Sequence, residues 1–234
     1  TAAACAAHGP AAESAVCDVA DSASVKAAFA RMDETLGAVD VLVNNAGIVH
    51  SDPAYMDHVK HIQSTQVMEV MTEGRVKTHA RTIELLTDEM FDRMLRIHLY
   101  GTFHCTREAL PRMRESGRGG RIINMGSIMG TAALGGAPDY CAAKGAILAF
   151  TRATAREAAS YGVLVNAIAP GFIDTPLLLN FDDANKQLIA AQTPLGRLGT
   201  PAEIASAALF LAGPGATFMT GQTVSPNGGI YMSQ

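Results

Sequence analysis

A phenol and an ammonium stand one helical turn apart in this chain, as Tyr140 and Lys144 of APDYCAAKGAILAF. Residues four apart on a helix share a face, so both groups would project into one site. Ser127 precedes them and ends the apolar stretch RIINMGS, which is typical of a buried strand followed by a loop. In open α/β sheets, ligands bind beyond the carboxyl ends of the strands. The three groups together predict proton transfer to or from a carbonyl or alcohol oxygen.

Alternating strand-like and helical segments would hold these groups in place. The strand-like runs are residues 14–17, 39–44, 121–125, 163–168 and 222–224. Longer amphipathic patterns separate them, and this alternation predicts an α/β fold with a doubly wound parallel sheet covered by helices on both faces. Ser22 and Thr87 are each expected to cap the start of a helix, and Pro138 and Pro201 are each expected to begin one. Asn44 is expected to tie neighbouring strands together.

The bulk composition is that of one domain. The 234 residues are 48% hydrophobic, which allows a large core without disulfides. A net charge of −4 argues against a nucleic acid or an anionic membrane as partner, because both favour a basic face. The cysteines have no C-x-x-C spacing, the first residues lack a basic signal segment, and no apolar run is long enough to cross a bilayer. The expected location is therefore the cytoplasm.

Five motifs in order resemble the short-chain dehydrogenase/reductase family of the compact type. They are the Ser127–Tyr140–Lys144 set, Asn44-Asn45-Ala46-Gly47 after VDVLV, Asp18 in CDVAD, Pro170-Gly171 in NAIAPGFIDT, and the tail from PLGRLGTPAEIA to PNGG. The resemblance covers nearly the whole chain except roughly residues 49–86, and it extends to 3-oxoacyl-acyl-carrier-protein reductase-like members. It implies a Rossmann-like fold in three α/β/α layers, NAD or NADP as cofactor, and interconversion of a secondary alcohol and a ketone.

The resemblance also implies roles for individual residues. Tyr140 would be the general acid in reduction and the base in oxidation, Ser127 would hydrogen-bond the substrate oxygen, and Lys144 would hold the cofactor's ribose hydroxyls. Further cofactor contacts would be Asp18 and Val19 at the adenine, Asn45, Ala46 and Gly47 where the backbone approaches closely, and Pro170, Gly171, Ile173 and Thr175 at the carboxamide. Tyr140 and Lys144 would also contact the cofactor, and no metal is implied.

A charge argument supports the pairing of Tyr140 with Lys144. A free phenol has a pKa near 10, and lowering it by about three units takes roughly 4 kcal/mol. One ammonium about 4 Å away supplies about that much at an effective dielectric constant near 20. We therefore expect Lys144 to lower the pKa of Tyr140.

His98 departs from the family pattern, which usually has an asparagine at this position. In the family that asparagine shapes its helix so that its main-chain carbonyl holds a water linked to the lysine. Histidine also offers a carbonyl, so His98 is either a structural substitute or, because histidine changes charge near neutral pH, a titrating member of a proton relay.

The glycine-rich turn of a dinucleotide fold, T-G-x-x-x-G-x-G in this family, does not occur in the sequence. By the family's strand order, its first two strands would lie between residues 14–17 and 39–44. We expect the natural protein to carry roughly 40–50 further N-terminal residues, since the sheet would otherwise leave a gap lined by unpaired backbone groups. The residue that selects NAD or NADP follows the second of these strands, so the choice is left open.

Residues 49–86 form an insertion relative to the family. Within it, residues 53–72 predict an amphipathic helix because apolar residues recur at near-helical spacing: Tyr55, Met56, Val59, Ile62, Val67, Val70 and Met71. The helix is either a structural flap or subunit contact, or a lid over an apolar substrate pocket. The histidines His50, His58, His61 and His79 lack a metal-binding signature, so no metal is expected. Residues 177–192 are expected to line the substrate pocket.

The leading hypothesis is an NAD(P)(H)-dependent oxidoreductase acting on a small carbonyl or alcohol substrate. A catalytically inactive dinucleotide-binding regulatory or scaffold protein is the alternative, and an extended sugar-nucleotide epimerase would need a larger C-terminal domain. The resemblance implies a homo-oligomer, a tetramer or a dimer, in which residues 88–115 and 139–160 pair across a two-fold axis. The second segment offers a surface of small and apolar residues, namely Ala142, Ala146, Ala149, Phe150 and Ala153.

Overall fold

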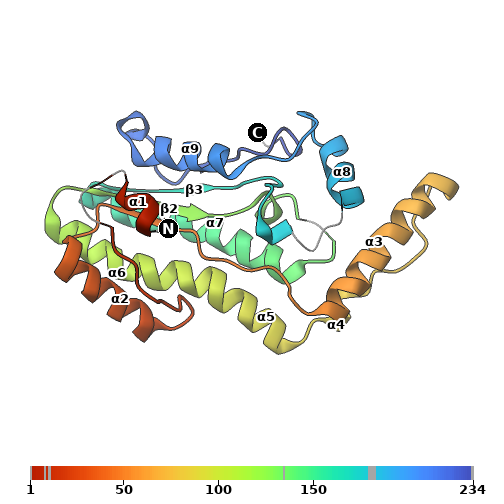
Figure 1. Cartoon of the computed structure of the whole chain (residues 1–234), viewed down its shortest axis with the longest axis horizontal. Helices are drawn as coiled ribbons and strands as arrows, with labels where there is room; N and C mark the ends of the chain where they lie inside the picture. Colours follow the sequence, from red (N-terminus) through yellow and green to blue (C-terminus); the bar gives the residue numbers. More distant parts are fainter. Residues whose placement is uncertain (1, 8, 10–11, 134, 179–182, 233–234) are drawn as a thin grey trace.

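The computed structural model of the protein describes residues 2–7, 9, 12–133, 135–178 and 183–232 (Figure 1). Within these residues one parallel sheet has the order β1 (Val41–Asn44), β2 (Gly120–Met125), β3 (Val163–Ile168) and β4 (Thr223–Val224). The helices are α1 (Ala2–Ala6), α2 (Ser22–Leu36), α3 (Pro53–Glu73), α4 (Thr82–Leu85), α5 (Asp88–Leu95), α6 (Gly101–Ser116), α7 (Pro138–Ala158), α8 (Asp183–Gln192) and α9 (Pro201–Ala212). A π-helical turn, Arg96–Tyr100, joins α5 to α6, and 3-10 turns occur at Ile128–Gly130, Ala159–Tyr161, Pro176–Leu178 and Pro214–Ala216. In the described part of the chain no helix is both long and apolar enough to span a lipid bilayer.

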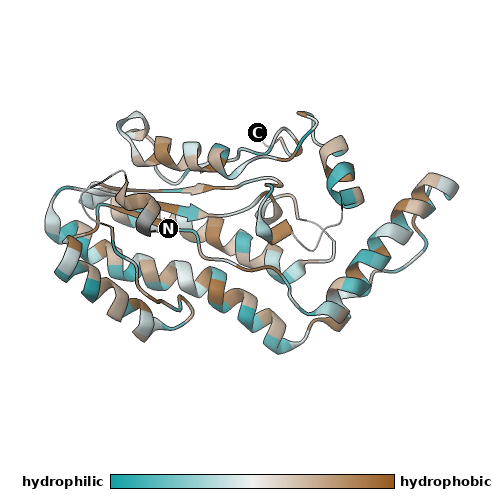
Figure 2. Cartoon of the chain, in the orientation of Figure 1, coloured by the Kyte–Doolittle hydropathy of each residue, from teal (hydrophilic) through white to brown (hydrophobic). Residues whose placement is uncertain are grey.

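Helices cover both faces of the sheet, as the alternating pattern predicted (Figure 1). Successive strand residues point to opposite faces, so Ile122 packs in a core cluster with residues of α2, α6 and α7, whereas Ile123 packs with Leu211 of α9. Figure 2 shows hydrophobic residues along the strands and α9, while α2 and α3 alternate between hydrophobic and hydrophilic positions. The layers are therefore helix, sheet and helix.

The predicted helix starts are confirmed at Thr87, Pro138 and Pro201. Thr87 caps α5, since its side chain accepts a hydrogen bond from the Met90 N–H. The prediction that Ser22 caps α2 is wrong by one residue. The cap is Asp21, whose carboxylate accepts from two N–H groups of the first turn and so satisfies two otherwise unpaired donors.

Residues 14–17 are not a strand, contrary to the sequence prediction. Val16 is fully exposed, and the outward residues Val41 and Val43 of β1 are 42% and 44% exposed. Among the described residues, β1 is an edge strand with β2 on one side, and no strand lies beside residues 14–17. An extended run is held as a strand mainly by hydrogen bonds to a neighbour, and residues 14–17 have none to pair with.

A buried chain of side-chain hydrogen bonds ties the strands to the helices. The Asn44 amide donates to Asn124 Oδ1 at 2.8 Å and to Thr106 Oγ1 at 3.1 Å, and the Asn124 amide donates to Thr151 Oγ1 at 2.9 Å. Asn124 is completely buried. These hydrogen bonds join β1, β2, α6 and α7 at the end of the sheet where the catalytic candidates lie. They confirm the structural role predicted for Asn44.

The predicted helix in the insertion is also confirmed. Asp52 caps α3 by accepting from the Tyr55 N–H, and Gly74 ends it in the left-handed conformation, with φ of 70°. Tyr55, Val59 and Ile62 are buried, but the later apolar residues are exposed: Val67, Met68, Val70 and Met71. Figure 1 shows α3 running outward from one end of the molecule, so only its first half packs against the body.

Replacing Asn124 by leucine should lower the free energy of unfolding by about 1–3 kcal/mol, because buried polar groups of Asn44 and Thr151 lose a partner. Urea denaturation followed by circular dichroism measures the loss. The matched control is Gln187→Leu on the exposed face of α8, which should change stability by less than about 0.5 kcal/mol. If the two substitutions changed the free energy of unfolding equally, the buried hydrogen bonds of Asn124 would not be stabilising.

Candidate active site

A cavity of about 640 Å³ lies beyond the carboxyl ends of β1, β2 and β3. Asn45 and Gly47 line it after β1, Ser127 after β2, and the segment 170–173 after β3, while α7 contributes Tyr140 and Lys144. This is the place where ligands bind in parallel α/β sheets. The structure thus brings the residues proposed for chemistry to one cavity.

The three catalytic candidates, Ser127, Tyr140 and Lys144, lie together at the carboxyl end of β2. The Ser127 and Tyr140 side chains are hydrogen-bonded to each other. Lys144 is only 5% exposed, and its Nζ donates to the Met125 carbonyl at 2.8 Å. The same Nζ lies 5.6 Å from the centre of the Tyr140 ring. An ammonium at the end of β2 and a phenol one turn earlier on α7 therefore line the same cavity.

Burial determines the protonation of this pair, and here the sequence expectation was wrong. The pKa of Tyr140 is raised, not lowered, because removal from water disfavours the phenolate more than the Ser127 hydrogen bond favours it. Burial also lowers the pKa of Lys144 to about 8. The Lys144 ammonium, which lies 5.6 Å from the ring centre and is directed at the Met125 carbonyl, does not offset this cost of burial. At neutral pH, Tyr140 holds its proton and Lys144 is charged.

His98 lies beside Tyr140, with its ring edge-on to the phenol at 5.4 Å between ring centres. It is 1% exposed, its Nε2 lies 2.8 Å from the Ile48 carbonyl, and its Nδ1 has no partner among the described residues. Burial and the nearby Lys144 lower its pKa to about 4. His98 is therefore neutral at pH 7, which argues against the titrating relay member that the sequence allowed. Its carbonyl accepts from Thr102 Oγ1 at 2.8 Å.

The position of the His98 ring also explains why residue 47 is a glycine. A Cβ at position 47 would lie 2.6 Å from His98 Cε1, closer than such contacts allow. Glycine at this position therefore makes room for a histidine of the protein itself, whereas the sequence attributed it to close approach of the cofactor. His98 sits in the π-helical turn between α5 and α6, and π turns within α-helices frequently mark functional sites.

The structure separates the predicted cofactor residues into two groups. The cavity is lined by Asn45, Gly47, Pro170, Gly171, Ile173 and Thr175, together with Tyr140 and Lys144. Asp18, Val19 and Ala46 are not in its walls. Asp18 and Val19 lie at the start of α2, where the Val19 carbonyl meets His104 Nδ1 at 3.0 Å. The buried ammonium, the phenol and the Asn45 side chain at the strand ends are donors that fit the ribose and nicotinamide end of a dinucleotide.

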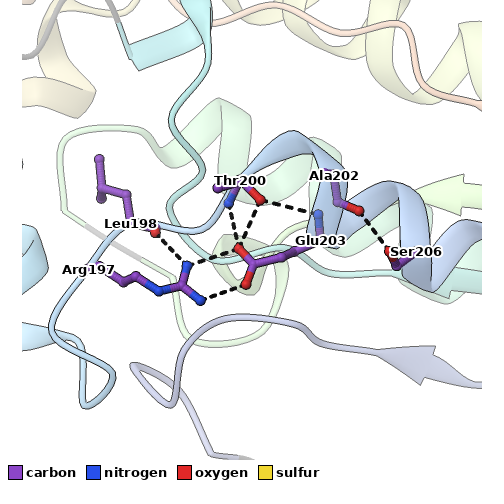
Figure 3. A network of polar contacts seen from close by, with 6 residues as sticks. All are labelled: Arg197, Leu198, Thr200, Ala202, Glu203 and Ser206. Atoms are coloured by element: carbon purple, nitrogen blue, oxygen red, sulfur yellow. Dashed lines mark hydrogen bonds and ion pairs between the residues drawn. The ribbon is translucent and has the colours of Figure 1, made fainter.

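The segment after β3 is held by the start of α9. Ile173 and Gly199 form a parallel bridge, in which the Asp174 N–H donates to the Gly199 carbonyl and the Gly199 N–H donates to the Phe172 carbonyl. Figure 3 shows the contacts that hold the segment around Gly199. The Glu203 carboxylate accepts hydrogen bonds from Arg197 and from Thr200, and the Thr200 hydroxyl accepts one from the Glu203 N–H. These contacts hold the pocket-lining residues Ile173 and Thr175 in place.

Sequence reasoning missed a polar pair beside the catalytic tyrosine. Asp139 is fully buried, and both its oxygens lie within 2.9 Å of Nε2 of His50. His50 lines the cavity, as do Lys60 and Gln63 of α3. The available signal was an acidic residue directly before Tyr140, with a histidine directly after the NAGIV strand end; His50 was considered only as a metal ligand. Among the described residues, no three His, Cys, Asp or Glu side chains are grouped to hold a metal.

The pocket-lining expectation for residues 177–192 is confirmed in part. Leu177, Leu178 and Asn185 line the cavity, and the rest of the segment includes residues 179–182, which lie outside the described residues.

The chain is similar to known reductases over most of its length. A family profile described as Enoyl-(Acyl carrier protein) reductase matches residues 1–86 and 70–231. The 3-oxoacyl-(acyl-carrier-protein) reductase FabG of Vibrio harveyi is 35% identical over 92% of this chain and 76% of its own length. That of Pseudomonas aeruginosa is 36% identical over 93% of this chain and 76% of its own.

A solved structure has the same fold. A gluconate 5-dehydrogenase from Burkholderia cenocepacia, in complex with NADP and tartrate, aligns with a TM-score of 0.80 at 31% identity. The alignment covers 98% of this chain and 79% of that one. The predicted Rossmann-like α/β fold is thereby confirmed.

The relatives are oxidoreductases, and nothing in these matches supports the alternative of an inactive scaffold. The chain is an NAD(P)-dependent enzyme that interconverts alcohols and ketones. Similarity of this extent in both sequence and structure reflects common descent, and the chain belongs to the short-chain dehydrogenase/reductase family.

Proposed function

We propose that Tyr140 is the proton donor of a ketone reductase, with Ser127 and Lys144 as its partners. The observation that carries the proposal is the contact set itself: a half-buried phenol hydrogen-bonded to a serine and one turn from a buried ammonium. Burial keeps the proton on Tyr140, which suits a general acid and hence the direction of reduction.

The proton transfer follows from these groups. Nicotinamide, when bound, supplies the hydride to the carbonyl carbon. The Ser127 hydroxyl donates a hydrogen bond to the carbonyl oxygen and stabilises the charge that develops there. Tyr140 then gives its proton to that oxygen, so that the phenol O–H bond breaks and the alcohol O–H bond forms. The resulting phenolate is stabilised by the Lys144 ammonium.

Lys144 is also suited to returning the proton. Its pKa of about 8 makes its ammonium a stronger acid than an ordinary lysine, whose pKa is near 10.4. A phenolate beside it is thus reprotonated more readily. His98 is a structural neighbour in this scheme, since it is neutral, and its ring supports the edge of the phenol.

The substrate proposed is a ketone with an apolar body. Met56, Val59, Leu177 and Leu178 supply apolar walls on both sides of the cavity. The relatives' names point to 3-oxoacyl thioesters, and the structural neighbour's title points to a sugar acid. Oxidation of NADPH and of NADH, followed by absorbance with one ketone of each kind, tests the proposal; absence of turnover with every pair would contradict it.

We further propose one domain with a helical insertion at residues 49–86, a cytoplasmic location and a homo-oligomer. A hydrophobic face between α6 and α7 supports the oligomer, because Phe103 is 37% exposed and stacks edge-on with Phe150 of α7. Light scattering should therefore give at least a dimer at micromolar concentration. A monomer would contradict the proposed oligomer while leaving the chemistry untouched.

Tyr140→Phe should lower kcat for ketone reduction by at least about 100-fold, within the range that general acid catalysis contributes. The change removes only the hydroxyl, so the circular dichroism spectrum and Tm should change little. Steady-state kinetics with any active ketone measures the effect. Retention of more than about a tenth of kcat would remove Tyr140 as proton donor.

The pH dependence of reduction should reflect Lys144. Because the charged form of Lys144 is required and its pKa is about 8, kcat/KM should fall as pH rises through about 8. Lys144→Arg keeps its positive charge above that pH, so the residual kcat/KM of this variant should no longer fall there. Lys77→Arg, on the exposed part of the insertion, is the control and should keep the wild-type profile. A wild-type profile that is flat from about pH 7 to 10 would overturn the role of Lys144.

A further inference from the structure

The cavity has an unbalanced set of charges. The described residues that line it include Lys60 and Lys144 but no aspartate or glutamate, although the chain carries a net charge of −4. Lys144 is engaged with the Met125 carbonyl. Within the described residues Lys60 makes neither a hydrogen bond nor an ion pair with the protein. Lys60 is therefore a cation of the cavity that no described residue neutralises.

Lys60 belongs to a continuous face of α3 that lines the cavity. Met56, Val59, Lys60 and Gln63 all line it, and their spacing is that of one helical stripe. A helix rises about 1.5 Å per residue, so Lys60 lies roughly 6 Å further along the axis than Met56. Because α3 runs outward from the body (Figure 1), the apolar part of the face comes first and the polar part follows.

This face is fixed to the segment that begins the catalytic helix. The Tyr55 hydroxyl donates to the Gly136 carbonyl at 3.1 Å, and the Gln63 amide donates to the Gly135 carbonyl at 3.4 Å. A Cβ on Gly136, whose φ is +95°, would lie 3.0 Å from Val59 Cγ1, so this close packing of α3 depends on glycine.

The contact of His50 with Asp139, one residue before Tyr140, adds a third polar contact between residues 49–86 and this segment. Residues 49–86 thus form one wall of the cavity.

The opposite wall is apolar and comes from the segment after β3. Leu177 and Leu178 line the cavity there, with Asn185 of α8. A ligand with its oxygen at Tyr140 and Ser127 would pass between these leucines and the Met56–Val59 part of α3. Its far end would then reach Lys60.

We propose that Lys60 binds an anionic group at the far end of the substrate, so that the enzyme acts on ketones with an apolar body and a terminal carboxylate or phosphate. A partly desolvated ammonium gains most from a charged partner, because hydrogen bonds to ions are the stronger ones. This inference rests on the proposed function for its kinetic test but not for its binding test.

The binding test uses inert probes and needs no turnover. Isothermal titration calorimetry compares octanoate, octyl phosphate and neutral octanamide on the wild-type protein and on Lys60→Gln. We expect the wild type to bind at least one anion about tenfold more tightly than the amide, and Lys60→Gln to lose that preference. Lys60→Arg should keep it. Which anion binds better distinguishes a carboxylate substrate from a phosphorylated carrier.

The matched control is Lys77→Gln, a lysine of the same insertion that is ion-paired with Glu73 and lies outside the cavity walls. It should bind the anions as the wild type does. Equal binding of octanoate, octyl phosphate and octanamide by the wild type, or the same loss in both glutamine variants, would overturn the proposal.

The kinetic test compares a keto acid with its methyl ester. Lys60→Gln should raise KM about tenfold for the acid and leave KM for the ester and the cofactor within about twofold. An equal rise for acid and ester, or a rise for the cofactor, would contradict a substrate-anion site. If no ketone is turned over at all, the proposed function fails while the calorimetric result still decides the role of Lys60.

Discussion

The site depends on one buried ammonium at the end of a buried strand. Taking a lysine out of water is costly, and Lys144 recovers part of that cost through the Met125 carbonyl, the last residue of β2. The contact ties α7 to the sheet, because the ammonium of the helix donates to the carboxyl end of that strand. With α7 fixed in this way, Tyr140 faces Ser127 and the cavity. One residue earlier in β2, the buried Asn124 amide donates to Thr151 of α7, and the Asn124 side-chain carbonyl accepts from Asn44 of β1, so the same strand and helix are held at a second point.

Burial gives the site its chemistry as well as its geometry. The same removal from water raises the pKa of Tyr140 and lowers those of Lys144 and His98. The phenol is left as an acid, the lysine as a cation that gives up its proton more easily than usual, and the histidine as a neutral ring. The chemistry is thus supplied by the strand ends and α7, while residues 49–86 supply a wall with a cation of its own. We propose that the strand ends and α7 determine the reaction, whereas residues 49–86 select the substrate.

Local signals in the sequence were sufficient for most of the elements that build the site. The strands around the cavity, the cap at Thr87 and the prolines that begin α7 and α9 were predicted because each depends on a few adjacent residues. Residues 14–17 were predicted wrongly, since a strand needs a neighbour that a local pattern cannot guarantee. The direction of the Tyr140 pKa shift was also wrong, because a pairwise charge argument left out the cost of burial. The role of Gly47 in making room for His98 and the contact of His50 with Asp139 join segments about 50 and 90 residues apart, and no local pattern reports such contacts.

The buried ammonium can be observed directly by labelling the lysines with carbon-13 at Cε and following their NMR shifts with pH. The Lys144 signal is assigned by its absence in Lys144→Arg. This signal should titrate near pH 8, well below the signals of lysines exposed on the surface, because burial disfavours the charged form of Lys144. A midpoint near 10.4, the value of a solvated lysine, would show that Lys144 is not buried in solution and would contradict the account at its centre.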